Sequence, residues 1–387
     1  MLNGFAVVFI SGLILGKIAK TLKLPPLTGM IFSGILLGPH AFGLISSELM
    51  NISADLRQLA LVIILTRAGL TLEINDLKKI GRPAVMMCFV PACFEIAGTI
   101  LIAPLIFGIS HIEAAVLGSV LAAVSPAVVV PRMIKIIEEG YGRERKIPQL
   151  VLAGAAADDV FVIVMFTSFA ALCAGGSFVF SSIAQVPVSI ITGIVVGALG
   201  GYIVTKWFEK TEIKSAIKVV ILLSISFVFL YIQDNISAFS GLIAIMSMGM
   251  AITHFNKDEA KLLSSKYNEL WTGAEIMLFV LVGAEVEIAY ALSAGALAIA
   301  MVVAALVFRM AGVFCCTVKT NLNKKERLFC MISYTPKATV QAAIGAVPLS
   351  MGLACGNLVL TAAVLAILIT APVGAAVIDS TYKKLLK

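Results

Sequence analysis

Two adjacent aspartates, Asp158 and Asp159, lie in the apolar stretch AGAAADDVFVIVMFTSF, residues 153–169. A carboxylate removed from water is costly in its charged form unless a proton, a cation or a basic side chain neutralises it. Carboxylate oxygens are also ligands that hard monovalent cations prefer. The pair therefore indicates a buried site for a proton or a cation.

The composition of the chain places these aspartates in a membrane. Of 387 residues, 60% are hydrophobic and 13% are charged, and the mean hydropathy is +1.04. Such values lie far outside those of soluble globular domains. Runs of about 20 apolar residues are typical of membrane-crossing helices, and they predict an all-α membrane protein. Thirteen runs begin near residues 4, 25, 57, 84, 113, 148, 183, 216, 239, 269, 291, 328 and 357.

The distribution of lysine and arginine predicts how the chain is oriented. Basic residues in short loops stay on the cytoplasmic side of a membrane. All but four of the 29 lysines and arginines follow odd-numbered runs. We therefore expect the N-terminus outside and the C-terminus inside. The net charge of +7 reflects this topology, and nothing in the composition supports nucleic-acid binding.

Arg309 and Lys337 lie deep within apolar runs. An unpaired Arg or Lys at the centre of a membrane helix costs about 2.5 to 3.5 kcal/mol even on a lenient insertion scale. With a rise of about 1.5 Å per residue, both lie near the middle of the bilayer. The acidic residues at the same depth are Asp158, Asp159 and Glu95. We expect these five charges to form one buried cluster, with Arg309 paired to Asp158 or Glu95.

Two of the runs are interrupted in a matching way. The fifth contains SPAVVVP (residues 125–131) and the twelfth contains TPKATVQ (residues 335–341). Proline removes a backbone donor and clashes with the preceding turn, so both helices are expected to unwind at these motifs and to cross. Their opposite directions predict an inverted repeat of six runs, a linking seventh and six more. Lys337 is expected to neutralise the negative helix ends at the crossing.

Further motifs carry a family resemblance over nearly the whole chain. They are LPPLTGMIFSGILLGP (residues 24–39), RAGLTLEI (67–74), GSVLAAVSPAVVVP (118–131), the adjacent aspartates, LFVLVGAEV (278–286) and PKATVQAAIG (336–345). Together they resemble the monovalent cation:proton antiporters of the second branch, specifically the NHA type of sodium/proton antiporter.

The resemblance implies a domain organisation. A core domain would hold the crossed helices, a separate domain would dimerise, and alternating access would be elevator-like. We place the core at about residues 83–175 and 290–379, the dimerisation or scaffold part at about 1–82 and 214–289, and a linking helix at 176–213. The expected protein is a homodimer embedded in the lipid of the plasma membrane.

The resemblance also implies roles for individual residues. Asp159 is the expected main ligand of the cation or proton, and Asp158 is expected to pair with Arg309. The Ser125 hydroxyl and carbonyl groups freed at the break would supply further oxygen ligands. A carboxylate that binds either a proton or a sodium ion, but not both, produces exchange through competition.

Arg309 departs from the lysine that many relatives carry at this position. Arginine cannot lose its proton in a protein. With Glu95 and Lys337 as further charge-compensating residues, Asp159 would be the only group that exchanges. This predicts an electroneutral exchange of one proton for one cation.

The sequence thus predicts a secondary active antiporter, not an enzyme, that exchanges sodium or lithium for protons. No cofactor or nucleotide is expected, since the glycine-rich GALGG at residues 197–201 lies in an apolar run and lacks the GK[ST] ending of a phosphate-binding loop. One alternative is a potassium/proton antiporter. Another is a sodium-coupled organic-anion symporter of similar architecture, which would not need adjacent aspartates. A passive channel or sensor on the same fold is a third.

Overall fold

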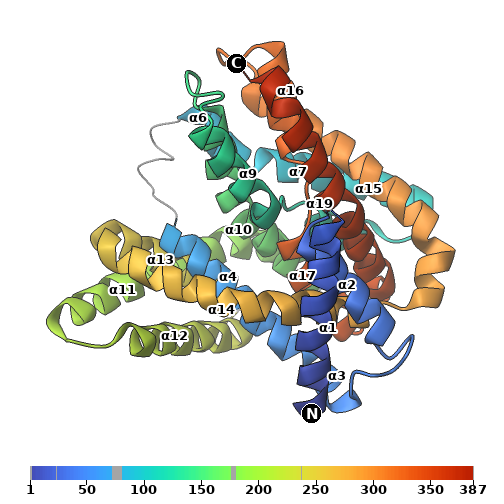
Figure 1. Cartoon of the computed structure of the whole chain (residues 1–387), viewed down its shortest axis with the longest axis horizontal. Coiled ribbons are helices and arrows are strands. Elements are labelled where there is room, and N and C mark those ends of the chain that lie inside the picture. Colours follow the sequence, from blue (N-terminus) through green and yellow to red (C-terminus); the bar gives the residue numbers. More distant parts are fainter. Residues whose placement is uncertain (1, 23, 72–80, 176–179, 237, 387) are drawn as a thin grey trace. The chain divides into compact units, whose positions relative to one another are not determined.

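The structure is a computed structural model of the chain (Figure 1). It describes residues 2–22, 24–71, 81–175, 180–236 and 238–386. Over these ranges every regular element is a helix, which confirms the all-α prediction. Four lysines used to predict the orientation, and part of the predicted linking helix, lie outside the described residues: Lys23, Lys78, Lys79, Lys387 and residues 176–179.

The chain divides into two compact units. The first comprises Met1–Leu56, Lys79–Gly175 and Ile276–Lys387, and the second comprises Arg57–Lys78 and Gly176–Glu275. The first unit contains both predicted core segments together with the N-terminal helices. The assignment of a moving core and a dimerisation part to these segments stays a prediction.

Most of the helices belong to the first unit. They are α1 (Leu2–Thr21), α2 (Pro26–Leu37), α3 (Ser47–Asn51), α6 (Arg82–Met87), α7 (Val90–Phe107), α8 (His111–Leu121), α9 (Pro126–Glu138), α10 (Ile147–Cys173), α15 (Ile288–Thr317), α16 (Lys324–Ser333), α17 (Thr339–Ile344), α18 (Val347–Ser350) and α19 (Gly356–Leu385). The second unit holds α11 (Phe180–Lys210), α12 (Ser215–Asn235) and α13 (Gly241–Phe255). Two helices, α4 (Ser53–Thr71) and α14 (Lys257–Ala284), extend from one unit into the other.

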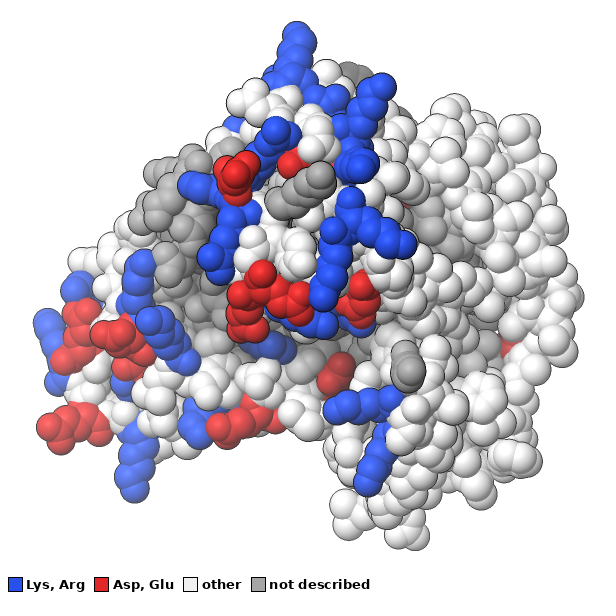
Figure 2. All heavy atoms as spheres, turned by 45° about the horizontal axis from the view of Figure 1, so that its top comes forward, with Lys and Arg blue, Asp and Glu red and all other residues white. Residues whose placement is uncertain are grey.

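Many of these helices have the length and composition of membrane spans. Among the described residues, seven segments are long and apolar enough to cross a membrane, and shorter apolar helices accompany them. The seven are Leu2–Thr21, Arg82–Phe107, His111–Glu138, Ile191–Lys210, Ser215–Gln233, Ile288–Thr317 and Gly356–Leu385. Helices occupy all thirteen predicted runs, but thirteen crossings and the orientation of the termini stay predictions. Figure 2 shows broad surface areas without charged side chains, which suits contact with lipid.

Local sequence signals explain where the helices near the crossing begin and end. The capping box of Ser110 and Glu113 starts α8, and that of Asn323 and Glu326 starts α16. In each box the two residues satisfy backbone N–H groups that have no partner inside the helix. Gly108, in the left-handed region with φ 66°, ends α7. Helices α8 and α16 therefore start at defined residues.

Two glycines allow α7 and α15 to approach closely. A side chain at Gly98 of α7 would overlap the ring of Phe308, and a Cβ atom at Gly312 of α15 would lie 2.8 Å from the Cα atom of Pro91. Gly98 lies one turn from Glu95, and Gly312 lies one turn from Arg309. The close packing of these two helices thus brings a buried acid next to a buried base.

Candidate functional site

Both predicted interruptions are present in the structure. The first separates α8 from α9 at residues 122–125, and the second separates α16 from α17 at residues 334–338. The predicted position of the first was partly wrong, since Pro126 and Pro131 lie inside α9. Proline is well tolerated in the first turn of a helix, where its missing N–H group needs no partner. The chain therefore unwinds before Pro126 and not along the whole motif.

The two breaks are bonded directly to each other. The backbone N–H of Ser125 donates to the carbonyl oxygen of Pro336 at 2.8 Å. The side-chain amide of Gln341 donates to the carbonyls of Val120 (3.2 Å), Leu121 (3.3 Å) and Ala123 (2.9 Å). The last carbonyls of a helix have no partner within it, so Gln341 satisfies the C-terminal end of α8 from the facing helix.

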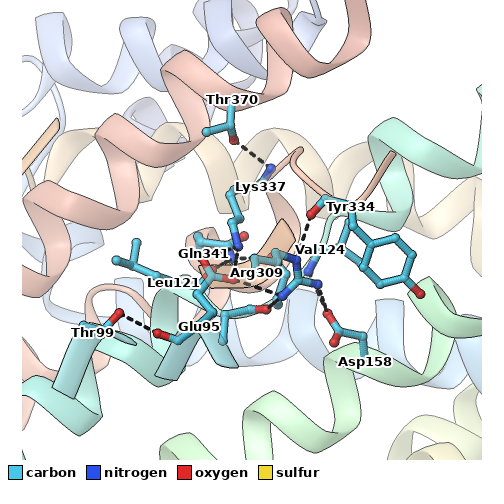
Figure 3. A network of polar contacts seen from close by, with 12 residues as sticks. Glu95, Thr99, Leu121, Val124, Asp158, Arg309, Tyr334, Lys337, Gln341 and Thr370 are labelled. Atoms are coloured by element: carbon cyan, nitrogen blue, oxygen red, sulfur yellow. Dashed lines mark hydrogen bonds and ion pairs between the residues drawn. The ribbon is translucent and has the colours of Figure 1, made fainter. Parts of the chain in front are cut away.

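Arg309 is the centre of the site, and its side chain is fully buried. One terminal nitrogen donates to Asp158 Oδ2 at 2.6 Å. The other donates to Glu95 Oε2 at 3.0 Å and to the carbonyl of Ala122. The remaining nitrogen, Nε, donates to the carbonyl of Tyr334 at 2.7 Å. Figure 3 shows the guanidinium between both breaks and the two acids. The predicted pairing of Asp158 with Arg309 is confirmed.

Within the described ranges, the side chain of Lys337 bonds to an acid and not to the helix ends. Its ammonium group donates to Glu95 Oε1 at 2.7 Å and to Oε2 at 2.6 Å. Its backbone N–H donates to the Thr370 hydroxyl at 2.8 Å. The carbonyls that Lys337 was expected to neutralise are instead bonded by Arg309 and Gln341, because the planar guanidinium can bond acids and carbonyls at once.

Asp158 and Asp159 are adjacent in sequence but differ in their partners. Asp158 Oδ2 accepts from Arg309 and also from the backbone N–H of Val124 at 2.9 Å. The Oδ1 atom of Asp159 is buried and has no hydrogen-bond partner among the described residues. The same holds, within that part of the chain, for Asp158 Oδ1 and the Ser125 hydroxyl oxygen. These oxygen atoms are suitable ligands for a hard cation, and the carboxylate of Asp159 is a suitable proton acceptor.

Sequence reasoning missed several residues of the site. Gln341 lies in the TPKATVQ motif, where a polar amide in an apolar half-helix was the available signal. Tyr334 contributes a backbone carbonyl and Thr370 a hydroxyl acceptor. A backbone carbonyl leaves no trace in the residue type, so the sequence contained no signal for the role of Tyr334.

Comparison with known proteins agrees with this architecture. The family model described as "Sodium/hydrogen exchanger, transmembrane" matches residues 5–384. The chain belongs to the sodium/hydrogen exchanger family. Its members are transporters and not enzymes, as predicted.

Two human members of this family can be aligned with the full length of the chain. Human sodium/hydrogen exchanger 9B2 is 32% identical over 100% of this chain and 75% of the relative. Human sodium/hydrogen exchanger 9B1 is 31% identical over 100% of this chain and 78% of the relative. The solved sodium proton antiporter MjNhaP1 from Methanocaldococcus jannaschii at pH 8 superposes with a TM-score of 0.85 at 20% identity, covering 98% of this chain and 97% of that one. This last similarity shows a shared fold.

Proposed function

We propose that this protein is a secondary active antiporter that exchanges sodium or lithium for protons, with Asp159 as the competing site. The observation that carries the proposal is the contrast between the two aspartates. Through Oδ2, Asp158 is bonded to Arg309 and to the backbone of the first break, whereas Asp159 forms no ion pair with a described residue and its buried Oδ1 has no partner there. Asp159 is thus the carboxylate that can bind a transported ion.

The charges of the site support a stoichiometry of one to one. Glu95 and Asp158 contribute two negative charges, and Arg309 and Lys337 contribute two positive charges, all joined by ion pairs. These four charges cancel, so Asp159 is the only uncompensated carboxylate in the cluster. A single proton or a single monovalent cation restores neutrality, and carrying both at once would leave a buried positive charge. The exchange would therefore be electroneutral.

In the proposed cycle, Asp159 faces one side of the membrane at a time. The Ser125 hydroxyl and carbonyls at the first break would complete the oxygen ligands of the cation, while Arg309 and Gln341 hold the crossing together. Ion gradients supply the driving force, and no cofactor, nucleotide or nucleic acid takes part. Potassium is the alternative substrate, because oxygen ligands alone do not select among monovalent cations.

The proposal includes the topology and the assembly. Thirteen crossings would place the N-terminus outside and the C-terminus inside. In support, α1 begins and α19 ends at opposite ends of the first unit (Figure 1), as an odd number of crossings requires. The two breaks that face each other support an inverted repeat. We further propose a homodimer in the plasma membrane.

The test is a flux assay on purified protein in sealed liposomes. Sodium, lithium, potassium or choline is added outside, and internal pH is followed with a dye. Sodium or lithium should drive proton release, choline should not, and Asp159→Asn should abolish the flux while leaving a folded protein. Near wild-type flux in that variant would refute the assignment of Asp159. Flux driven by an organic anion together with sodium would identify the symporter instead.

Electroneutrality is tested in the same liposomes. The membrane potential is clamped with valinomycin and potassium, and the sodium gradient that balances a fixed proton gradient is measured. A one-to-one exchanger gives a balance point independent of voltage. A balance point that moves with voltage would show net charge movement and contradict the charge count.

A further inference from the structure

Tyr334 touches Arg309 in two ways. Its carbonyl accepts from the Nε atom of Arg309 at 2.7 Å, and its ring lies 5.3 Å from the guanidinium carbon, within the range of a cation–π contact. The tyrosine is fully buried. Figure 3 shows its hydroxyl pointing away from the guanidinium, and that hydroxyl donates to the carbonyl of Met87 at 3.4 Å.

The other end of Tyr334 fits against a glycine of α10. Gly154 lies four residues, about one helical turn, before Asp158. A Cβ atom at Gly154 would overlap the Tyr334 hydroxyl oxygen, and it would lie 3.1 Å from Cζ of the same ring and 2.7 Å from Cβ of Met87. Glycine inside a helix costs about 1 kcal/mol relative to alanine. The missing side chain at Gly154 leaves a notch in the surface of α10, and the hydroxyl end of Tyr334 occupies this notch. Glycine is required there for steric reasons.

We propose that Tyr334 is a positioning residue that sets the contact between Arg309 and Asp158. The tyrosine holds the arginine with its carbonyl and ring, and it holds α10, which carries both aspartates, by fitting into the notch at Gly154. The distance between base and acid is thereby fixed from both sides by one residue. This inference rests on the proposed function, in which Asp158 stays paired while Asp159 exchanges.

Loss of this alignment has a defined consequence. When Arg309 is displaced, Asp158 is less well compensated and competes with Asp159 for protons. When a positive charge moves away from a carboxylate, the protonated form of that carboxylate becomes more favourable. The aspartates then lose their protons only at higher pH, and sodium can bind only after that loss. The ionisable groups around the alignment are Glu95, Asp158, Asp159, Arg309, Lys337, Cys88, Cys93 and Cys316. Sodium-driven exchange should accordingly shift to more alkaline pH.

The test compares variants on both sides of the contact in the liposome assay. Gly154→Ala should slow exchange about tenfold or more, since small misplacements of reacting groups have effects of this order, and should move half-maximal exchange to higher pH. Gly154→Ala combined with Tyr334→Phe removes the overlapping oxygen and should recover much of the rate and the pH profile. The remaining contact with Met87 keeps this recovery incomplete. Gly295→Ala, where a Cβ meets only Leu365 at 3.9 Å, is the matched control.

A second pair of variants tests the ring. Tyr334→Phe keeps the ring over the guanidinium and should retain more exchange than Tyr334→Leu, whose pH profile should shift like that of Gly154→Ala. Melting temperatures of all variants in detergent report the same steric coupling without transport. The inference is overturned if the double variant is no better than Gly154→Ala in rate and melting temperature, or if the leucine and phenylalanine variants share one pH profile. Absence of sodium-driven exchange in the wild type would instead refute the proposed function, while the melting temperatures still decide the role of Tyr334.

Discussion

The first unit contains two networks of charged side chains that use the same residue types in different surroundings. The crossing network is fully buried and consists of Glu95, Asp158, Arg309 and Lys337. The end network joins the C-terminal ends of α9 and α19 and consists of Arg132, Lys135, Glu139, Asp379, Tyr382 and Lys383. In the latter, the side chains of Arg132 and Asp379 are 24% and 46% exposed.

Exposure decides what each network contributes. Exposed ion pairs are screened by water, and their median contribution to stability is about 0 to 1 kcal/mol. A buried pair is itself often neutral, but removing one partner leaves a charge without compensation in a low dielectric. Loss of one charged side chain from the crossing network is therefore expected to destabilise the fold strongly. Loss of one from the end network is expected to have little effect.

The largest effect on stability is expected for Arg309→Ala. This change removes the ion-pair partner of Asp158 and leaves Glu95 paired with Lys337 alone. It also removes the bonds of Arg309 to the carbonyls of Ala122 and Tyr334. Removing one partner of a buried pair costs about 3 to 5 kcal/mol. The neutral replacement Asp159→Asn keeps the volume and breaks no ion pair among the described residues. Thermal unfolding in detergent should therefore show a much lower melting temperature for Arg309→Ala, and equal values would contradict the comparison.

The next effect concerns the pair of Lys337 and Glu95. Glu95→Gln leaves the buried Lys337 without an acidic partner, and Lys337→Met leaves Glu95 paired with Arg309 alone. The double variant removes one positive and one negative charge, and residues in direct contact show coupling energies of about 0.5 to 3 kcal/mol. We expect the double variant to be more stable than the sum of the two single losses predicts. Strictly additive melting temperatures would show that the two side chains act independently.

A smaller effect is expected for Arg132→Ala in the end network. Its guanidinium donates to Asp379 at 3.2 Å and to the carbonyl of Val128 at 2.8 Å, within its own helix. Loss of such an exposed pair costs at most about 1 kcal/mol. Asp379→Ala is the matched variant on the other side of the pair. A fall in melting temperature as large as that of Arg309→Ala would remove the distinction between the networks.

The smallest effect is expected for Tyr382→Phe, and it should depend on pH. The Tyr382 hydroxyl donates to Glu139 at 2.6 Å, and this bond, with Lys383 and Lys135 nearby, lowers the pKa of Glu139 from its ordinary value. A lowered pKa in the folded state stabilises it above the ordinary pKa of glutamate, about 4.3, and the contribution is lost as the pH falls through the folded value. The variant should thus be slightly less stable than the wild type at pH 7. Thermal unfolding from pH 7 to pH 3 should show the two melting temperatures converging, and a difference that grows on acidification would contradict the sign.

The membrane class, the helices and the membership of the buried cluster could be predicted from the sequence. Hydropathy locates the helices, and the rise per residue gives the depth of each charge, so Glu95 could be grouped with Asp158 and Arg309 before any contact was known. Depth leaves open the direction in which a side chain points around its helix. The sequence therefore left the partner of Arg309 undecided between two acids, and the structure shows that both are bonded.

The details of the breaks were less predictable. Proline marks the neighbourhood of an interruption, but the residues that unwind depend on which backbone groups find partners elsewhere. Residues 122–125 are non-helical because Arg309 and Gln341, from helices distant in sequence, bond the carbonyls around them. Such tertiary hydrogen bonds leave little trace in local composition, and the same applies to the notch at Gly154.

The bond between the Ser125 amide and the Pro336 carbonyl involves main-chain atoms alone. Side chains at both positions can therefore change in evolution while the breaks remain joined, provided that position 125 retains its N–H group. The hydroxyl of Ser125 has no hydrogen-bond partner among the described residues. It can therefore be replaced by another oxygen ligand or by a methyl group without loss of a hydrogen bond. Cation preference in descendants of this protein can accordingly change through the side chain at position 125, while the backbone N–H of the same residue keeps the two breaks joined.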